Sequence, residues 1–474
     1  MKITKKTIGV GIWTILIALM FSVGFEFGEK PVLVVEAQAL GAKENYLAAV
    51  TYFSSSLENI TFAEVKNQIL SSDQPVFISK TIEQEAEELF GVEKFSAHIQ
   101  IKDAKDIDDS LNQKEGVLGI LPWSEVNFRV KTLAVDNVWL WDKNADLAKY
   151  PLKYLSVGEN YLQEFSSKKV IDLTAAGEMI MARKTADRIK AYNSCDWPFD
   201  KVRDTLSAAD FTIATLEAPF YSDYNFSITG MVFQVDPACV AGVVNSGIDL
   251  VSVAANHLGD AGQAGILETL SLLDKNKILH VGGGQNKTDA HQPALKEING
   301  VKFAFLGYND VPPGSYAADD NSAGSAWIDI DQITEDVTEA KKQADVVVAL
   351  MHWGVEYTNF PNSNQQEAAR VAFDAGADLI VGDHPHWVQG LEFMGDKSGS
   401  RFGYTTYGIG NFVFDQMWST ETMQGSIQQF VFYGKNLVSA TILPTQIEDW
   451  GQPRIMGKDE GQAVLDRIWE ASKY

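Results

Sequence analysis

Positively charged residues are scarce in this chain of 474 residues. Lys and Arg number 39 against 63 Asp and Glu, which gives a formal net charge of −24 at pH 7. Because no excess of cationic side chains is available to displace counterions from phosphates, nonspecific nucleic-acid binding is excluded. The same charge disfavours an anionic substrate unless a local cation, such as a metal ion, intervenes.

Cysteine is rarer still, with Cys195 and Cys239 as the two copies. Neither lies in a CxxC motif or beside a histidine motif, so the sequence does not favour cysteine catalysis. Two cysteines suit an exported protein that either forms one disulfide or keeps two free thiols, and the sequence leaves both open. The composition, 45% apolar and 22% charged, is that of a globular protein with room for two or three domains.

One long apolar run lies near the N-terminus, at residues 7–25, and three lysines precede it. At 1.5 Å per residue the run spans roughly the ~30 Å hydrocarbon core of a membrane. We therefore predict a transmembrane anchor within residues 1–30 that places the protein in the cell membrane with its body outside the cytoplasm. A cleaved signal peptide, which would release the protein outside the cell, is the alternative.

Two regions with different patterns follow the apolar run. Residues 40–155 mix helical and strand patterns and predict a small α/β domain of unknown role. Over residues 168–450, near-continuous apolar segments alternate with amphipathic helical patterns, which predicts an α/β layered fold with strands buried on both faces. Turns at Asn299-Gly300 and near Gly434 predict two β-hairpins. Residues 451–474 predict a helical tail.

Polar side chains stand where five of the predicted strands end. They are Glu178, Glu217, the pair Asn256-His257 with Asp260 three residues on, His352, and the pair His384 and His386 on either side of Pro385. In open α/β sheets, ligands bind in the crevice beyond the carboxyl ends of the strands. We therefore expect these side chains to surround one crevice.

The side chains of this set have the chemistry of metal ligands. Two carboxylates, an Asn carbonyl and three imidazoles suit one or two divalent transition-metal ions, Mn, Fe or Zn. A bridging carboxylate would allow two ions about 3.5–4 Å apart that clamp an anionic group and activate a water molecule. His257, with Asp260 at i+3, fits an oriented general acid. The alternatives are structural: carboxylates and an Asn cap at helix starts, and a core histidine beneath Trp353.

Six segments occur in order along the chain: GEMIMAR, TLEAPF, AANHLGDAG, HWGVEY, GDHPHWVQG and YGIGNFVFDQ. Together they resemble the signature of the poly-γ-glutamate capsule synthesis protein CapA family, a branch of the calcineurin-like metallophosphatase superfamily. The resemblance covers residues 168–450. It implies a metallophosphatase-like β-sandwich flanked by helices, with two metal ions at its edge.

The resemblance also implies roles for individual residues. One ion would be held by Glu178, Glu217 and His386, and the other by Glu217, Asn256, His352 and His384. His257 would be the general acid, supported by Asp260. Four further residues fall in the family motifs and would contact the substrate or support the ligands: Arg183, Glu356, Asn411 and Asp415.

The sequence departs from the superfamily pattern at three places. Glu178 replaces the usual first-motif Asp, no histidine follows it in a D-x-H arrangement, and Thr215 stands where the family more often has Asn. One ion would have three protein ligands and the other four. We therefore predict one firm metal site, with four ligands, and one site with three that is weaker or completed by substrate.

The function implied by the resemblance is metal-dependent hydrolysis of a phosphoester or a related anionic group, during synthesis or export of a poly-γ-glutamate-like capsule polymer. The expected partners are that anionic polymer or phosphoester, the membrane, and other capsule-synthesis membrane proteins. A non-catalytic component that grips the polymer through a metal ion within a membrane assembly is the alternative, and a structural domain without metal is a third possibility.

Overall fold

The computed structural model describes residues 43–112, 116–156 and 164–473. The predicted anchor within residues 1–30 lies outside these ranges. Over the described ranges, no helix combines the length and the apolar character needed to cross a membrane.

The first described region contains a mixed sheet with the strand order β4-β3-β5-β1-β6, and β8 pairs with β1. Its strands are β1 (Lys43–Tyr52), β3 (Val76–Ser79), β4 (Ile99–Lys102), β5 (Leu118–Pro122), β6 (Val130–Thr132) and β8 (Lys153–Ser156). The helices of this region are α3 (Phe62–Ser71), α4 (Glu83–Phe90) and α5 (Ala104–Asn112), and a short pair joins β2 (Asn59–Ile60) to β7 (Ala134–Val135). The α/β character expected here is therefore present.

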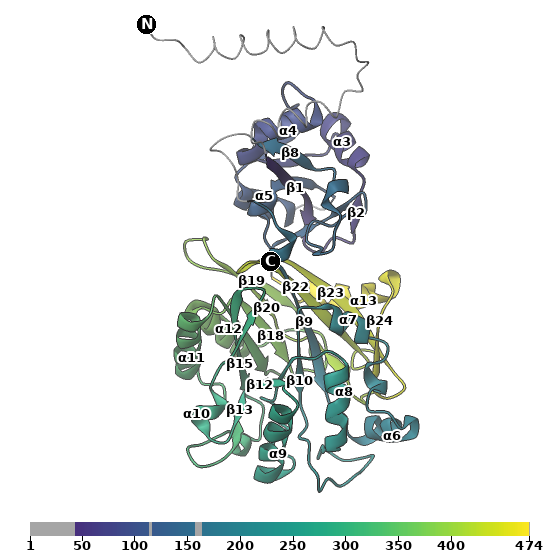
Figure 1. Ribbon diagram of the computed structural model, residues 1–474, viewed down its shortest axis with the longest axis vertical. Helices are drawn as coiled ribbons and strands as arrows, with labels where there is room; N and C mark the ends of the chain where they lie inside the picture. Colours follow the sequence, from purple (N-terminus) through teal and green to yellow (C-terminus); the bar gives the residue numbers. More distant parts are fainter. Residues whose placement is uncertain (1–42, 113–115, 157–163, 474) are drawn as a thin grey trace, which may run out of the picture. The chain divides into compact units, whose positions relative to one another are not determined.

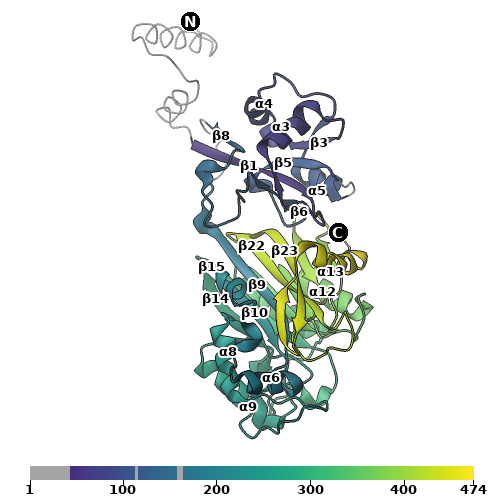
Figure 2. The ribbon, with the colours of Figure 1, turned by 90° about the vertical axis from the view of Figure 1, so that its right-hand side faces the viewer.

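Two larger sheets form a β-sandwich (Figure 1). The first has the order β12-β11-β10-β9-β22-β23-β24, with β21 beside β9. Its strands are β9 (Val170–Met179), β10 (Phe211–Leu216), β11 (Leu250–Ser252), β12 (Leu279–Val281), β21 (Asn411–Val413), β22 (Gln424–Tyr433), β23 (Asn436–Glu448) and β24 (Gln452–Ile455). Strands β9 to β12 run parallel, and Figure 2 shows the long β22–β23 hairpin, in yellow, beside β9.

The second sheet of the sandwich has the order β14-β15-β17-β18-β20-β19. Its strands are β14 (Ala294–Ile298), β15 (Val301–Asn309), β17 (Val346–His352), β18 (Leu379–Asp383), β19 (Leu391–Gly395) and β20 (Phe402–Thr406). The four central strands of this sheet are parallel. A two-stranded pair, β13 (Gly283–Gly284) and β16 (Gly324–Ser325), lies outside both sheets.

Helices cover the outer faces of the sandwich. Alternate residues of β17 show why: Val346 and Val348 pack into the core between the two sheets, whereas Val347 and Ala349 pack with the helices α11 and α12. Side chains alternate across a strand, so a continuous apolar run fills both faces. The helices are α6 (Arg183–Tyr192), α7 (Arg203–Ala208), α8 (Val240–Asn245) and α9 (Gly262–Lys275) against the first sheet, and α10 (Lys287–Ala290), α11 (Ile330–Gln343) and α12 (Ser363–Ala375) against the second.

Several local predictions are confirmed. Asn299 and Gly300, with φ of 48° and 82°, form the turn of the β14–β15 hairpin, and Gly434, with φ of 58°, turns β22 into β23. The tail contains helix α13 (Lys458–Glu470), but its first part is the strand β24, which pairs with β23 and extends the first sheet beyond the predicted boundary at residue 450. Cys195 and Cys239, which the sequence left open, are joined in a disulfide.

The parallel strands bring distant segments to one edge of the sandwich. Glu178 in β9 pairs in register with Thr215 of β10 on one side and with Asn411 of β21 on the other. In the second sheet, His352 at the end of β17 pairs with Asp383 at the end of β18. The polar groups predicted at strand ends therefore come from both sheets.

Substituting Gly177 by Ala should disturb this edge. A Cβ at Gly177 would lie 2.0 Å from the carbonyl oxygen of Gly410, so the β9–β21 contact next to Glu178 would have to open. We expect Gly177→Ala to lower the free energy of unfolding by about 1–3 kcal/mol, the usual range for overpacking. The measurement is denaturant unfolding of the full-length chain. Gly314→Ala is the control, because a Cβ there meets Trp327 at an ordinary 3.8 Å; equal effects of both changes would contradict the expectation.

Candidate metal centre

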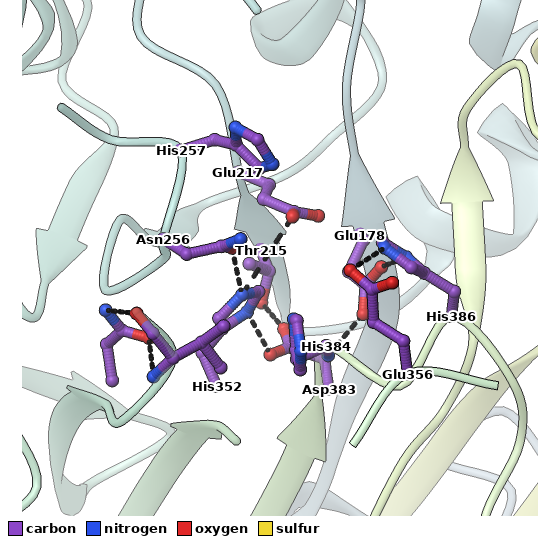
Figure 3. A network of polar contacts seen from close by, with 12 residues as sticks. Glu178, Thr215, Glu217, Asn256, His257, His352, Glu356, Asp383, His384 and His386 are labelled. Atoms are coloured by element: carbon purple, nitrogen blue, oxygen red, sulfur yellow. Dashed lines mark hydrogen bonds and ion pairs between the residues drawn. The ribbon is translucent and has the colours of Figure 1, made fainter. Parts of the chain in front are cut away.

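The predicted ligand residues meet at the edge of the sandwich (Figure 3). Glu178 is supplied by β9, and Glu217 directly follows β10. His352 ends β17, and His384 follows the last residue of β18. All four side chains are buried. The side chains expected to gather at the strand ends are thus brought together, and both sheets supply them.

The ligand atoms form two overlapping clusters. Glu217, His352 and His384 make the first, and Glu178, Glu217 and His386 make the second; within each cluster the atoms lie within 4.8 Å of one another. Asn256 adds to the first cluster, because its Oδ1 lies 2.9 Å from His352 Nε2. Glu217 is common to both clusters. This division matches the two ligand sets that the family resemblance implied.

Glu217 shows that the first cluster fits a cation. Its side chain is 0% exposed, and neither carboxylate oxygen has a hydrogen-bond partner among the described residues. Burial, helped by the negative charge of Glu178, raises the pKa of Glu217 to about 7. A buried carboxylate without a partner is costly, and a bound divalent cation would compensate for it.

His384 fits the same cation. It is buried, and its Nδ1 has no hydrogen-bond partner in the described part of the chain. Burial, together with the neighbouring imidazoles His352 and His386, holds the pKa of His384 well below its usual value. The ring is therefore neutral near pH 7 and presents a lone pair, which is the form of histidine that binds metals. Carboxylate and imidazole together suit Mn, Fe or Zn.

Asp383 orients His352, a role that the sequence motifs did not predict. Its Oδ1 lies 2.8 Å from His352 Nδ1, and its Oδ2 accepts a hydrogen bond from the hydroxyl of Thr215. Burial alone would lower the pKa of His352, but Asp383 outweighs this effect and raises it. Ligand histidines commonly donate their second ring N–H to a carboxylate. This preference could have predicted the role of Asp383 from the sequence, because Asp383 directly precedes His384 in the GDHPHW motif.

The second cluster is closed by an ion pair. His386 Nδ1 lies 2.6 Å from Glu178 Oε2 and 2.9 Å from Asn411 Oδ1, and Glu178 Oε1 accepts a hydrogen bond from the backbone N–H of His384. Burial opposes charge on His386, but Glu178 raises the pKa of His386 to about 9. In return, His386 outweighs the effect of burial and lowers the pKa of Glu178 below its usual value.

The turn that carries the two histidines has an uncommon backbone. His384 has φ of 89° and His386 φ of 57°, a region that residues other than glycine seldom adopt. Glu178 holds the N–H of His384, and the N–H of Tyr357 donates to the carbonyl of Pro385 at 2.8 Å. Such strain persists where the surroundings impose it. Here it places the two rings 5.8 Å apart, one in each cluster.

His257 lies beside Glu217 at the crevice (Figure 3). Its Nδ1 is 2.8 Å from Asp260 Oδ2, which also accepts the backbone N–H of Phe233 at 2.6 Å. The ring of Phe233 packs against the imidazole with centroids 4.3 Å apart. This is the oriented His–Asp arrangement that the i+3 spacing predicted.

The four further motif residues lie around the clusters. Arg183 forms an ion pair with Asp415, and its guanidinium lies over the ring of Phe233. Asn411 is occupied with His386. Glu356 is 40% exposed, with Oε1 at 3.9 Å from His386 Nε2. Substrate contact by these residues stays a prediction, and Glu356 is the best placed for it because it is the most exposed.

Comparison with known proteins identifies the family. Residues 172–416, a little over half of the chain, match the family described as bacterial capsule synthesis protein PGA_cap. The chain belongs to this family. The matched range contains all the candidate ligands.

Two curated relatives support the assignment of this PGA_cap protein. It is 32% identical over 267 residues to a "PGA biosynthesis protein CapA" of Bacillus subtilis (strain 168), a range that covers 56% of this chain and 68% of the relative. It is 29% identical over 292 residues to a "Capsule biosynthesis protein CapA" of Bacillus anthracis, covering 60% of this chain and 69% of the relative.

Among solved structures, a 5'-nucleotidase precursor of Thermus thermophilus is similar at a TM-score of 0.38 and 11% identity, covering 64% of this chain and 58% of that one. The sandwich flanked by helices is confirmed by the sheets and cores themselves. Its relation to the metallophosphatases stays a prediction from the motifs.

Replacing Glu217 by Gln should stabilise the metal-free protein while removing its metal binding. The folded state keeps a proton on Glu217 up to about pH 7, whereas the ordinary value is 4.5, so stability falls as pH rises between these values. Above this window we expect Glu217→Gln to raise the free energy of unfolding by about 1–3 kcal/mol. Thermal unfolding in chelator checks this, with the exposed Glu297→Gln as control. A destabilised Glu217→Gln protein would contradict it.

Metal affinity should depend on pH for the same reason. An ion that binds at Glu217 must displace its proton, so Mn²⁺ affinity should increase as pH rises from 4.5 to about 7, by at most about tenfold per unit for this one proton. His352, whose pKa is raised, adds to the slope because its Nε2 must also lose a proton to bind the ion, whereas His384 adds none near pH 7, because its pKa lies well below the usual value. Titration calorimetry across this range measures the slope, and a flat profile would show that Glu217 is not a ligand.

Proposed function

We propose that this PGA_cap protein is a metal-dependent hydrolase that acts on a phosphoester or a related anionic group during synthesis or export of a poly-γ-glutamate-like capsule polymer. The observation that carries the proposal is the buried carboxylate of Glu217, which has no hydrogen-bond partner among the described residues and clusters with the imidazoles of His352 and His384, with the His257–Asp260 pair beside it. The names of the two Bacillus relatives support the biological setting.

A bound metal ion would overcome the repulsion between this acidic protein and an anionic substrate. With a net charge of −24, the chain as a whole repels an anion. A divalent ion bound at Glu217, Asn256, His352 and His384 would supply local positive charge and lower the pKa of a bound water molecule. Asp383 accepts a hydrogen bond from Nδ1 of His352, so that Nε2, now 2.9 Å from Asn256 Oδ1, would be the nitrogen that holds an ion.

His257 supplies the proton in this scheme. Asp260 accepts the Nδ1 proton of His257, which orients the ring. The opposite nitrogen, Nε2, then gives a proton to the oxygen of the leaving group. Phe233 holds the ring from the side and limits its rotation.

We place the body of the protein outside the cytoplasm, anchored by the apolar run at residues 7–25, with secretion after cleavage as the alternative. The disulfide between Cys195 and Cys239 supports an oxidising compartment. The proposed partners are the membrane, the anionic polymer or phosphoester, and other membrane proteins of capsule synthesis.

A metal-dependent but non-catalytic grip on the polymer is the second candidate. The Glu178–His386 ion pair favours it, because this pair leaves the two-ion ligand set incomplete. The Arg183 charge is likewise neutralised by Asp415 rather than presented to a substrate.

Turnover separates the two candidates. With the full-length chain and Mn²⁺, we expect hydrolysis of p-nitrophenyl phosphate or its bis-ester, and a loss of ~100- to 10,000-fold in kcat for His257→Gln, the usual contribution of a general acid. His280→Gln is the matched control, because His280 forms a similar pair with Asp274 at 3.2 Å away from the ligands. Metal content, measured by mass spectrometry, should be the same in all three proteins. Stoichiometric metal without turnover on either ester would reject the hydrolase and favour the grip.

A further inference from the structure

We propose that this protein holds one metal ion, in the set Glu217, Asn256, His352 and His384, and that the Glu178–His386 ion pair takes the place of a second ion. The inference rests on the proposed function in treating the crevice as a metal site. It goes beyond that proposal by assigning the number of ions and a different role to two of the candidate ligands.

Unpaired ligand atoms are found in the first set. Among the described residues, both oxygens of Glu217 and the Nδ1 of His384 are buried without a hydrogen-bond partner. The Nε2 of His352 and the Oδ1 of Asn256 face each other at 2.9 Å. An ion bound among these atoms would replace the His352–Asn256 hydrogen bond and the 3.9 Å contact between Glu217 Oε1 and His352 Nε2, but it would not have to break a carboxylate–imidazole hydrogen bond like that of Glu178 and His386.

Apart from Glu217, the residues of the second set already have hydrogen-bond partners. Glu178 uses one oxygen for the N–H of His384 and the other for Nδ1 of His386, at 2.6 Å in the latter case. The same nitrogen of His386 lies 2.9 Å from Asn411 Oδ1. A second ion would have to compete with a buried, charge-assisted pair, which is among the stronger interactions in proteins.

The residue two positions after Glu178 also argues against a second ion. Superfamily members usually place a histidine two residues after the first-motif carboxylate. Here that position is Ile180, which is buried in the apolar core beneath α6 to α9 together with Met179. The second set therefore lacks the histidine that would follow its first carboxylate, and both oxygens of Glu178 are already engaged.

Glu178 also holds the backbone of the turn that carries His384, and this role explains its burial without a metal. It accepts the backbone N–H of His384, the residue with φ of 89°. By holding this strained turn, Glu178 fixes where His384 stands in the first set. The Glu178–His386 pair thus holds the turn that carries the ligand His384. Because the charges of this pair cancel, they do not offset the positive charge of the single ion, which remains able to attract an anionic group.

Metal counting on the full-length chain tests this. After chelation and reloading with Mn²⁺, we expect one ion per chain by mass spectrometry, the electron paramagnetic resonance spectrum of isolated Mn²⁺, and a second binding event at least ~10-fold weaker in calorimetry. His386→Gln and His384→Gln are the matched pair of variants. His386→Gln should keep the one ion, and His384→Gln should weaken it at least ~10-fold.

Two equivalents of similar affinity, or a spin-coupled spectrum of paired Mn²⁺, would overturn the inference even if the protein is an active hydrolase. One ion without turnover would leave the inference standing and reject the hydrolase. Failure of the chain to bind Mn²⁺ would reject both. If His384→Gln does not fold, as judged by thermal unfolding, the wild-type stoichiometry and spectrum decide alone.

Discussion

The burial of one carboxylate, that of Glu217, is the constraint around which this edge of the sandwich is organised. Its side chain has no exposed surface and no hydrogen-bond partner among the described residues. A charge in that position is tolerated only if a cation joins it or a proton neutralises it. The raised pKa of Glu217 shows the second response, and the surrounding imidazoles provide the ligands for the first.

The rest of the centre serves to place those imidazoles. Asp383 orients His352 and is itself held by Thr215 across the two sheets. Glu178 holds the backbone of His384. These contacts join β9 and β10 of one sheet to the ends of β17 and β18 of the other, so the packing of the sandwich and the geometry of the centre depend on each other.

The centre is asymmetric, and the asymmetry bears on function. One cluster offers unpaired ligand atoms, whereas the other contains a compensated ion pair. In a chain with a net charge of −24, the local charge of this crevice decides whether an anionic group can approach. Membership of the PGA_cap family gives a capsule setting for such a group. Proton transfer to that group by His257, oriented by Asp260, belongs to the proposed function.

The sequence by itself determined the local features and the types of ligand. Apolar runs buried on both faces predicted the strands, Asn299-Gly300 predicted a hairpin, and the polar residues at strand ends predicted the crevice, because each depends on neighbours a few residues away. Only the tertiary structure decided that Cys195 bonds to Cys239, that Asp383 orients His352, and that Glu178 pairs with His386. Glu178 and His386 are 208 residues apart, and such contacts depend on how the two sheets pack. Strand periodicity carries no information about that packing.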